Sequence, residues 1–345
     1  GGCGKAAAAA MAEDAISAAA GGQAPGDELP EGWSKQWSRK NERHYFFHAP
    51  TGRSVWTLED VQRAAPAGKR PRPEDAAAPT DDASALPPAA SRPRGERVAI
   101  IVPFRDLHPE QNREAHLRQF VPRMTQLLSS TGVEHSVYIV EQTNDGRKFN
   151  RGKLLNAGFR IARDEGCTIF VLHDVDLIPS AELMPWYTTR PEAPVHIARV
   201  WERYSNNPKY FGGVVAMSRE DYERTNGYPN NFWGWGGEDD ELMKRVDAVG
   251  LRVASPTAGR FEDLEHMTLR EKLSLLKAHQ VWKCMQKNEV LEEHAATWQA
   301  NGINSLTGCQ EVSRTQLAEH AWRISVELGP NGHWTDERSG VDDAK

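Results

Sequence analysis

Two aspartates separated by one residue follow an apolar run near the middle of the chain. The run Thr168-Ile-Phe-Val-Leu172 is typical of a strand buried on both faces, and His173, Asp174, Val175 and Asp176 come directly after it. In an extended chain Asp174 and Asp176 lie on the same face. Such carboxylates need a counter-charge, which a divalent cation such as Mg²⁺ or Mn²⁺ would supply through oxygen ligands. The spacing alone also suits a solvated turn with capping aspartates, so both interpretations stay open.

A tryptophan- and glycine-rich segment precedes a run of acids. Residues 232–241 read Phe-Trp-Gly-Trp-Gly-Gly-Glu-Asp-Asp-Glu. The two indoles offer flat faces that can pack against the apolar side of a sugar ring. An acid in the first turn of a helix interacts favourably with the helix dipole, which stabilises the helix by ~0.3–1 kcal/mol. This effect explains some of the four acids, but it does not explain the tryptophans. A carboxylate held here could act as a general base towards a sugar hydroxyl.

A second acidic segment contains a histidine. Asp263 and His266, with Glu262 and Glu265 beside them, follow residues 251–254, which we expect to be a strand. Carboxylate and imidazole groups are both metal ligands, although an ordinary surface role explains the same residues.

Two further segments carry arginines where a phosphate group could bind. Arg105 comes at the end of the first apolar run, where it could face a diphosphate or a uracil. Residues 149–153 (Phe-Asn-Arg-Gly-Lys) open a helical stretch whose amides and cations could hold phosphate. A surface salt bridge of Arg105 and helix capping by Asn150 are the alternatives.

These residues fall at the ends of alternating strands and helices. The order strand, helix, strand, helix, strand predicts a mostly parallel sheet with helices on both faces, and a ligand crevice at the carboxyl ends of the strands. A capping box at Ser218 starts a helix that ends at Asn226-Gly227. The expected strands are 98–102, 137–140, 168–172, 251–254 and 324–328, and the expected helices are one ending at Leu128, 151–164 and 238–249.

The composition changes along the 345 residues. A net charge of −6 excludes a global basic field for nucleic acid, and four scattered cysteines exclude a zinc ribbon or a disulfide-dense scaffold. No run approaches the roughly 20 apolar residues of a membrane span, and the Ala-rich start makes a poor signal peptide. The chain opens with Gly, so a missing N-terminal anchor stays an alternative. We expect a disordered Ala/Gly-rich segment over 1–27, a small aromatic module over 28–61, a Pro/Ala-rich linker over 62–95, a large domain over 96–335 and a disordered tail over 336–345.

The large domain closely resembles the β-1,4-galactosyltransferases, the inverting GT-A enzymes of glycosyltransferase family 7. The order and spacing of six segments agree with that family. They are Val98-Ala-Ile-Ile-Val-Pro-Phe-Arg105, Phe149-Asn-Arg-Gly-Lys-Leu-Leu-Asn-Ala-Gly-Phe159, Phe170-Val-Leu-His-Asp-Val-Asp-Leu-Ile-Pro179, Tyr210-Phe-Gly-Gly-Val214, residues 226–240 and Asn301-Gly-Ile-Asn-Ser-Leu306. The resemblance implies a GT-A domain, α/β and Rossmann-like with a mostly parallel central sheet.

The resemblance also implies ligands and roles: UDP-galactose as the donor and Mn²⁺ as the metal. Asp239 would be the catalytic base, with Glu238 and Asp240 supporting the acceptor and the base. Tyr210 stands where the family places a tyrosine favouring galactose, whereas a smaller aliphatic residue there admits N-acetylgalactosamine. Pro103, Phe104 and Arg105 would meet the uridine, Arg151 the diphosphate and Trp235 the sugars. The full set of implied nucleotide-sugar contacts is Pro103, Phe104, Arg105, Phe149, Arg151, Asp174, Val175, Tyr210, Gly213 and Trp235.

The implied metal ligands are Asp176, Asp263 and His266, and one of them departs from the family. Typical members supply a methionine and a histidine four and seven positions beyond the glycine that corresponds to Gly259, and here those positions hold Asp263 and His266. A carboxylate in place of a thioether makes the site harder, which favours activity with Mg²⁺ as well as Mn²⁺. The structural cysteines of the family do not align with those of this chain, which puts the usual disulfides in doubt.

The small aromatic module resembles a WW domain, a three-stranded antiparallel unit. Leu29-Pro30-Glu-Gly-Trp33 starts it, residues 45–47 (Tyr-Phe-Phe) form the middle strand, and Trp56 ends it. The family implies a groove for proline-rich peptides, formed here by Phe46 and Trp56. A structural hairpin with a degraded groove is the alternative.

Together these features predict a metal-dependent enzyme that moves galactose from UDP-galactose to a sugar hydroxyl in a β-1,4 linkage. The acceptor would end in N-acetylglucosamine or xylose. The alternatives are a catalytically inactive WW adaptor that binds proline-rich peptides, and transfer of N-acetylgalactosamine. The resemblance implies the Golgi lumen or membrane, and the cytoplasm is the alternative because no targeting segment is visible.

Overall fold

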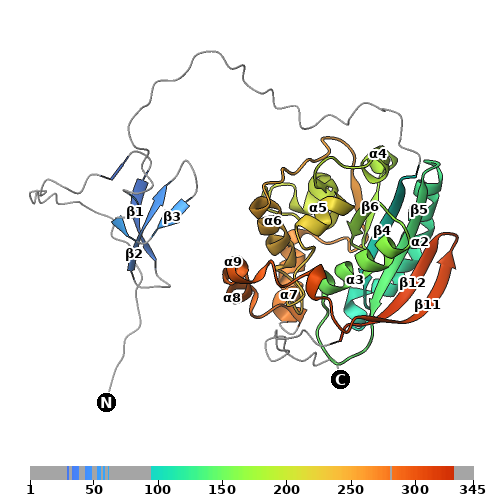
Figure 1. Cartoon of the computed structure of the whole chain (residues 1–345). Coiled ribbons are helices and arrows are strands. Elements are labelled where there is room, and N and C mark those ends of the chain that lie inside the picture. Colours follow the sequence, from blue (N-terminus) through green and yellow to red (C-terminus); the bar gives the residue numbers. More distant parts are fainter. Residues whose placement is uncertain are drawn as a thin grey trace, which may run out of the picture. The chain divides into compact units, whose positions relative to one another are not determined.

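The structure is a computed structural model that describes residues 29–30, 33–38, 43–48, 53–55, 57–58, 61, 95–279 and 282–329. The chain divides into two compact units, 1–79 and 80–345, which are described separately (Figure 1). The segments expected to be disordered, 1–27 and 336–345, lie outside the described residues, as does almost all of the expected linker 62–95.

The small unit contains a three-stranded antiparallel sheet. Its strands are β1 (Trp33–Ser38), β2 (Arg43–His48) and β3 (Arg53–Val55), with β2 in the middle. Phe46 of β2 pairs with Lys35 on one side and Val55 on the other, and its side chain is half-buried. Trp56, the other predicted groove residue, lies outside the described residues.

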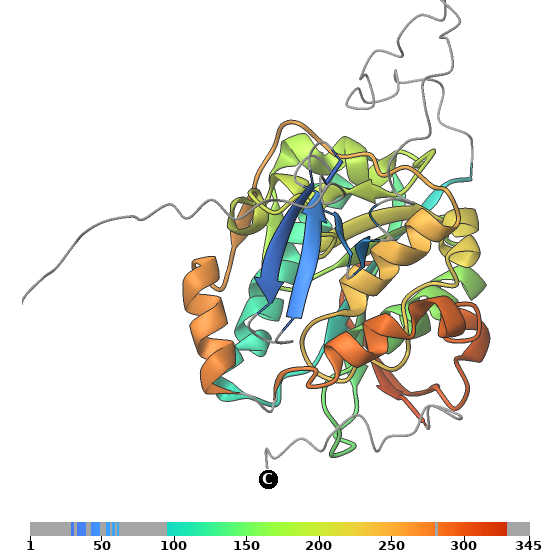
Figure 2. The same ribbon diagram turned by 90° about the vertical axis from the view of Figure 1, so that its left-hand side faces the viewer.

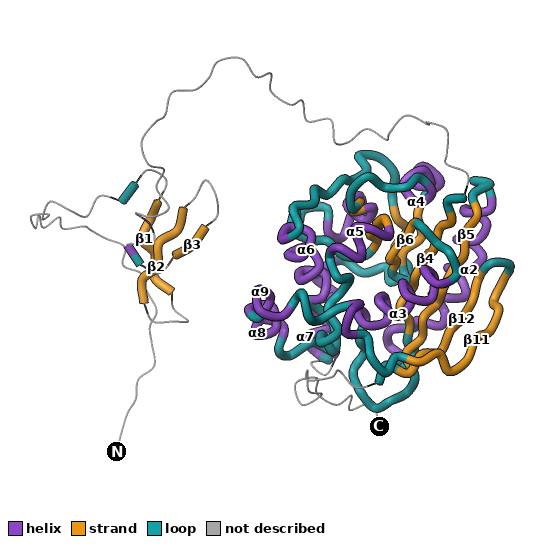
Figure 3. Tube along the Cα trace, viewed as in Figure 1, coloured by secondary structure: helices purple, strands orange, loops and turns teal. Residues whose placement is uncertain are grey.

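The large unit is built around a seven-stranded sheet with the order β11-β12-β5-β4-β6-β9-β8 (Figures 1 and 3). The four central strands run parallel, and the others pair antiparallel to their neighbours. The parallel strands are β12 (Ala321–Glu327), β5 (Glu134–Gln142), β4 (Arg97–Phe104) and β6 (Ile169–His173), and the remaining ones are β11 (Gln310–Ala318), β9 (Val214–Ser218) and β8 (Val195–His196). The predicted α/β fold with a mostly parallel sheet is therefore confirmed.

Strand β4 shows why the sheet is covered on both faces. Val98 and Ile100 belong to one apolar core with helix α2 (Arg113–Ser129), whereas Ala99 and Ile101 belong to the other with helix α3 (Arg151–Asp164). Successive side chains of a strand point to opposite faces, so a continuous apolar run fits this position. Helix α3 lies very close to the sheet, because a Cβ at Gly158 would stand 2.4 Å from Cγ2 of Ile101.

A short antiparallel ribbon joins two distant parts of the chain beside the sheet. Strand β7 (Leu177–Pro179) pairs with β10 (Phe261–Asp263), so that Leu177 lies opposite Asp263. The ribbon brings the acidic segment 262–266 next to the turn that follows β6.

The remaining helices lie between β6 and β12 in the chain. Figure 2 shows α6, α7 and α8 on the side of the large unit that faces the viewer. The helices are α4 (Met184–Thr188), α5 (Arg219–Arg224), α6 (Glu238–Ala248), α7 (Leu269–Ala278), α8 (Lys287–Glu292) and α9 (His294–Thr297). The side chain of Ser218 accepts a hydrogen bond from the backbone N–H of Asp221, so the predicted cap starts α5.

One predicted strand is wrong. Residues 251–253 have no strand structure, and Ala254 makes only an isolated bridge to Val195. Strand β8 is only two residues long, so it is too short to pair with the whole of the segment 251–254.

The structure also bears on disulfide bonds and on a membrane-spanning helix, neither of which the sequence indicated. Cys167, Cys284 and Cys309, which lie in the described part of the chain, are free thiols. None of the described helices is long and apolar enough to cross a membrane.

Candidate active site

A cavity of about 310 Å³ opens at the carboxyl ends of β4 and β6. This is where a parallel sheet places its ligand crevice. It gathers most of the predicted site residues but is not lined by Gly213, Asp263 or His266. The predicted residues that line it are Pro103, Phe104, Arg105, Phe149, Arg151, Asp174, Val175, Asp176, Tyr210, Trp235, Glu238, Asp239 and Asp240.

Arg151, the first residue of α3, connects two of the carboxylates that line this cavity. Its Nε donates to Oδ1 of Asp174 and its Nη1 donates to Oδ1 of Asp239, both at 2.8 Å. The Tyr228 hydroxyl donates to the same Asp239 oxygen at 3.3 Å. The sequence assigned Arg151 to a diphosphate, whereas the structure places it between the strand-end aspartate and the predicted base.

Glycines allow the backbone to come this close to Asp239. A Cβ at Gly212 would stand 2.3 Å from Oδ2 of Asp239, so a side chain there would displace the carboxylate. Gly236 and Gly237 both have a φ of +104°, which L-residues rarely adopt, and they turn the chain into the first residue of α6. Helix α6 therefore begins with its acids against the cavity.

Burial favours the neutral forms of three acids around Arg151, which we call the base cluster: Asp174, Glu238 and Asp239. Burial raises the pKa of Asp239 well above its usual value, and Arg151 counteracts this only in part. The pKa values of Asp174 and Glu238 are also raised by burial. Oε2 of Glu238 is buried and accepts no hydrogen bond from the described residues. An upward shift of the pKa is the direction that suits a carboxyl group acting as a general base.

Asp240 differs from these acids. Its side chain is 44% exposed and pairs with Nζ of Lys287 in α8 at 2.5 Å. The structure therefore places Asp240 at the rim of the cavity, away from the arginine that the other acids share.

Two of the predicted metal ligands, Asp176 and Asp263, lie in a second group of charges, which we call the ion cluster: Asp176, Asp263 and Glu265 with Arg113, Arg203 and Lys272. Arg113 Nη1 donates to Asp176 and its Nη2 donates to Glu265, both at 2.7 Å. Glu265 also pairs with Arg203 at 2.7 Å and with Lys272 at 2.5 Å. Asp263 pairs with Arg203.

The structure does not bring Asp176, Asp263 and His266 together as a set of ligands. Within the described ranges no three His, Cys, Asp or Glu side chains are grouped so that they could hold a metal ion. His266 is exposed and has a φ of +49°, and the carboxylates of Asp176 and Asp263 are already paired with arginines. The carboxylate oxygens nevertheless fit a hard cation, and the Arg113 guanidinium stands in for one between Asp176 and Glu265.

The predicted nucleotide contacts lie on the β4 side of the cavity. Arg105 is held by the carbonyl oxygen of Arg147 at 2.5 Å and lies 3.9 Å from Asp145. Phe104 packs beneath the guanidinium of Arg323, 5.0 Å from its ring centre. Arg105 is thus fixed by a loop that the sequence did not assign to the site.

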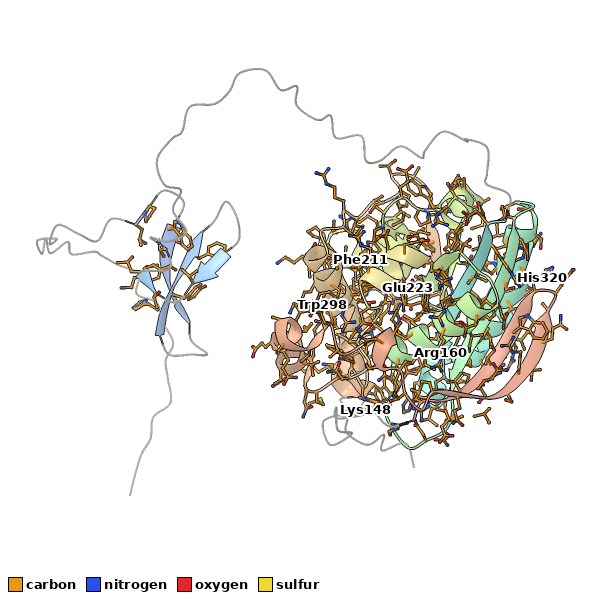
Figure 4. All side chains as sticks on the ribbon, in the orientation of Figure 1. Lys148, Arg160, Phe211, Glu223, Trp298 and His320 are labelled. Atoms are coloured by element: carbon orange, nitrogen blue, oxygen red, sulfur yellow. The ribbon has the colours of Figure 1, made fainter. Side chains whose placement is uncertain are left out.

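The aromatic residues form the other wall. Trp235 is 44% exposed, and its backbone N–H donates to the carbonyl oxygen of Trp282 at 2.6 Å. Tyr210 stacks on Tyr204 with ring centres 4.1 Å apart and planes inclined by 15°. Lys148, labelled in Figure 4, donates from Nζ to the carbonyl oxygen of Lys283 at 3.0 Å and so fastens the segment that holds Trp235.

Sequence reasoning missed Arg113, Arg203, Lys272, Tyr204, Trp282 and Lys287, all of which line the cavity. No local pattern in the sequence marks these residues, because they come from separate segments of the chain.

Comparisons with known proteins agree with this geometry. A model described as the N-terminal region of glycosyl transferase group 7 matches residues 76–188, one described as the N-terminal domain of galactosyltransferase matches 192–268, and a WW domain model matches 29–58.

Individual relatives match as well. Bos taurus β-1,4-galactosyltransferase 3 is 35% identical over 259 residues, which cover 73% of this chain and 60% of the relative. Mus musculus β-1,4-galactosyltransferase 4 is 35% identical over 221 residues, which cover 61% of this chain and 58% of the relative. The chain thus spans about 60% of the length of these curated relatives.

Solved structures resemble the large unit. The catalytic domain of Drosophila β-1,4-galactosyltransferase 7 in complex with xylobiose superposes with a TM-score of 0.58 at 27% identity, covering 71% of this chain and 100% of that one. A mutant of that enzyme in complex with manganese, UDP-Gal and xylobiose gives the same TM-score and identity. This chain belongs to the β-1,4-galactosyltransferases of glycosyltransferase family 7 and carries a WW domain before the galactosyltransferase region.

Proposed function

We propose that this chain transfers galactose from UDP-galactose to a sugar hydroxyl, with inversion and in a β-1,4 linkage, in a metal-dependent reaction. The observation that carries the proposal is Asp239, a half-buried carboxyl with a raised pKa at a cavity that also contains Asp174 and Asp176. The manganese and UDP-Gal bound by the Drosophila relative support the same donor and metal for this chain.

Asp239 serves as the general base in this reaction. Its ionised carboxylate accepts the proton of the acceptor hydroxyl while that oxygen forms a bond to the anomeric carbon. The bond between the anomeric carbon and the diphosphate oxygen breaks on the opposite side, and UDP leaves with the bonding electrons. Arg151 and the Tyr228 hydroxyl both donate to Oδ1 of Asp239, so Oδ2 is the oxygen that would accept the proton.

Asp176 and Asp263 are the residues of this chain that would hold the metal, with His266 as the ligand that the family resemblance adds. When bound, a divalent ion supplies Lewis-acid stabilisation of the negative charge on the departing diphosphate. The two carboxylates suit Mn²⁺ and also Mg²⁺, which prefers oxygen ligands.

The remaining contacts select the donor and the acceptor. Pro103, Phe104 and Arg105 hold the uridine, and Tyr210 fills the space that an acetamido group would need, which favours galactose over N-acetylgalactosamine. Trp235 presents an exposed indole to the acceptor sugar. The xylobiose bound by the Drosophila relative makes a xylose-terminated acceptor the first to test, ahead of N-acetylglucosamine.

One assay tests the proposal. The purified full chain is given UDP-galactose, Mn²⁺ and a panel of xylosides and N-acetylglucosaminides, and the products are analysed for linkage by NMR. Asp239→Asn is the matched inactive control. A β-1,4-linked galactoside formed by the wild type alone supports the proposal. No transfer to any acceptor, together with binding of a proline-rich peptide, would favour the inactive adaptor instead, and a preference for UDP-N-acetylgalactosamine would correct the donor.

The WW domain and the compartment are separate proposals. A proline-rich peptide is the partner that the WW domain match favours, with Phe46 in the groove. The Golgi is the compartment that the family membership favours.

A further inference from the structure

Tyr228 is a fully buried tyrosine whose hydroxyl contacts the proposed base. The hydroxyl donates to Oδ1 of Asp239 at 3.3 Å, and the Arg151 guanidinium lies 5.6 Å from the centre of the ring. A buried hydroxyl needs a hydrogen-bond partner, and the Asp239 carboxylate supplies one. The ring packs in one of the two apolar cores, and Tyr228 does not line the cavity. Any effect of Tyr228 on the reaction therefore acts through the residues around it.

The backbone of Tyr228 is fixed by Asn156, a fully buried residue of α3. Oδ1 of Asn156 accepts a hydrogen bond from the backbone N–H of Tyr228 at 2.9 Å, and its Nδ2 donates to the carbonyl oxygen of Tyr228 at 2.7 Å. Helix α3 also packs directly against this loop, because a Cβ at Gly152 would stand 2.6 Å from the carbonyl oxygen of Pro229. The helix that carries Arg151 therefore also determines where the Tyr228 ring lies.

The hydroxyl opposes the effect of burial on Asp239. Burial raises the pKa of Asp239, and the nearby acids Glu238 and Asp174 raise it further. Arg151 lowers this pKa, but its guanidinium also pairs with Asp174. A hydroxyl that donates to a carboxylate stabilises the ionised form, so the Tyr228 hydroxyl acts in the same direction as Arg151. The titratable and charged groups around Asp239 are Arg151 of α3, Asp174 after β6, Glu238 and Asp240 of its own helix, and the hydroxyls of Tyr204, Tyr210 and Tyr228.

We propose that Tyr228 is a positioning residue for the general base: its hydroxyl, held in place through Asn156, favours the ionised Asp239 carboxylate and leaves Oδ2 to accept the proton. This inference rests on the proposed function. Loss of the hydroxyl should matter most at low pH, where ionisation of Asp239 limits the reaction.

The pH dependence of kcat/KM for galactose transfer by the full chain tests the proposal. A carboxylate base is active above its pKa, and activity is lost as the pH falls through that value. Tyr228→Phe keeps the ring but removes a donor to the ionised form, so the pKa of Asp239 should rise. The acid limb should move to higher pH by about 0.5–1 units, the size expected for one hydrogen bond, while kcat/KM well above the limb approaches the wild-type value. Infrared titration of the Asp239 carboxyl band, identified by its absence from Asp239→Asn, should show the same shift without turnover.

Tyr222→Phe is the matched control. Tyr222 is also fully buried, but its hydroxyl donates to Oδ1 of Asn156 at 2.8 Å. Its removal disturbs the same hydrogen-bonded network without removing a donor to Asp239, so the acid limb should stay at its wild-type position.

Three results would overturn the inference. They are an acid limb at its wild-type position in Tyr228→Phe, an equal loss of kcat/KM at every pH, which indicates a purely structural role, and a limb that moves as far in Tyr222→Phe. Any of these alongside normal galactose transfer by the wild type rejects the role of Tyr228 alone. Absence of transfer by the wild type rejects the proposed function, and this inference with it.

Discussion

The two charged clusters of the cavity contain the same kinds of acid but shift their pKa values in opposite directions. In the ion cluster the pKa of Asp176 and that of Glu265 lie below their usual values, because Arg113 and Lys272 outweigh the effect of burial. In the base cluster burial raises the pKa of Asp174 and Asp239, because these acids share one guanidinium, that of Arg151. The number of cations within reach, rather than the residue type, therefore decides the direction in which the pKa of each acid shifts.

Asp263 shows that the contrast is graded. It belongs to the ion cluster, yet burial raises its pKa, and the pairing with Arg203 does not fully compensate. Its neighbour Glu265 has three cationic partners and shows the opposite shift.

The largest effect is expected from removing the base. Asp239→Asn keeps the shape of the side chain but cannot accept a proton, so kcat should fall by about 10²–10⁴-fold. Binding of UDP-galactose, measured by calorimetry, should be retained. Asp240→Asn, at the exposed rim of the same helix, is the comparison and should lose much less. Normal kcat with weakened donor binding in Asp239→Asn would place Asp239 in the donor site instead.

The next effect concerns the ion cluster. Asp176→Asn removes the carboxylate that Arg113 neutralises, and we expect the affinity for Mn²⁺ in the presence of UDP to fall about 10- to 100-fold. Circular dichroism should show an intact fold. Full wild-type activity in EDTA, or an unchanged Mn²⁺ affinity in the variant, would show that Asp176 does not hold the metal.

A smaller effect is expected in the pH profile. A base acts in its ionised form, so activity is present above its pKa and is lost as the pH falls through that value. Arg151 lowers the pKa of Asp239, so Arg151→Gln should raise this pKa further and move the acid limb of kcat/KM to higher pH. Arg163→Gln, which changes a half-buried arginine of the same helix, should leave the limb in place. A limb that moves to lower pH in Arg151→Gln would contradict the assignment of the base.

The smallest effect is a change of metal preference. Asp263→Met replaces an oxygen ligand by a thioether, and the ratio of Mg²⁺ to Mn²⁺ activity should decrease because Mg²⁺ strongly prefers oxygen. The neighbouring Glu262→Met, whose side chain is 46% exposed, serves as the control. Measurement of kcat/KM with each metal decides the matter, and an identical ratio in Asp263→Met and the wild type would exclude Asp263 from the metal site.

The sequence predicted the parallel core and the acids of the site because both depend on local patterns. Apolar runs marked β4, β5 and β6, and the glycines before Glu238 marked the turn into α6. The ion cluster could not be predicted in this way. Its cations, Arg113, Arg203 and Lys272, come from separate segments that only the folded chain brings to one place. Likewise, no local pattern shows that His266 lies exposed beside these acids.

The place of β12 in the sheet has a consequence for how the protein is made. Strand β12 pairs parallel with β5, so Ile324 lies opposite Val140, although the two are far apart in the chain. During synthesis β5 therefore has no partner on this edge until residues near His320, labelled in Figure 4, have left the ribosome. An unpaired apolar edge invites aggregation, so a nascent chain would need shielding at this stage. Loss of the β11–β12 hairpin should accordingly reduce the yield of folded protein, even though the hairpin contributes no residue to the cavity.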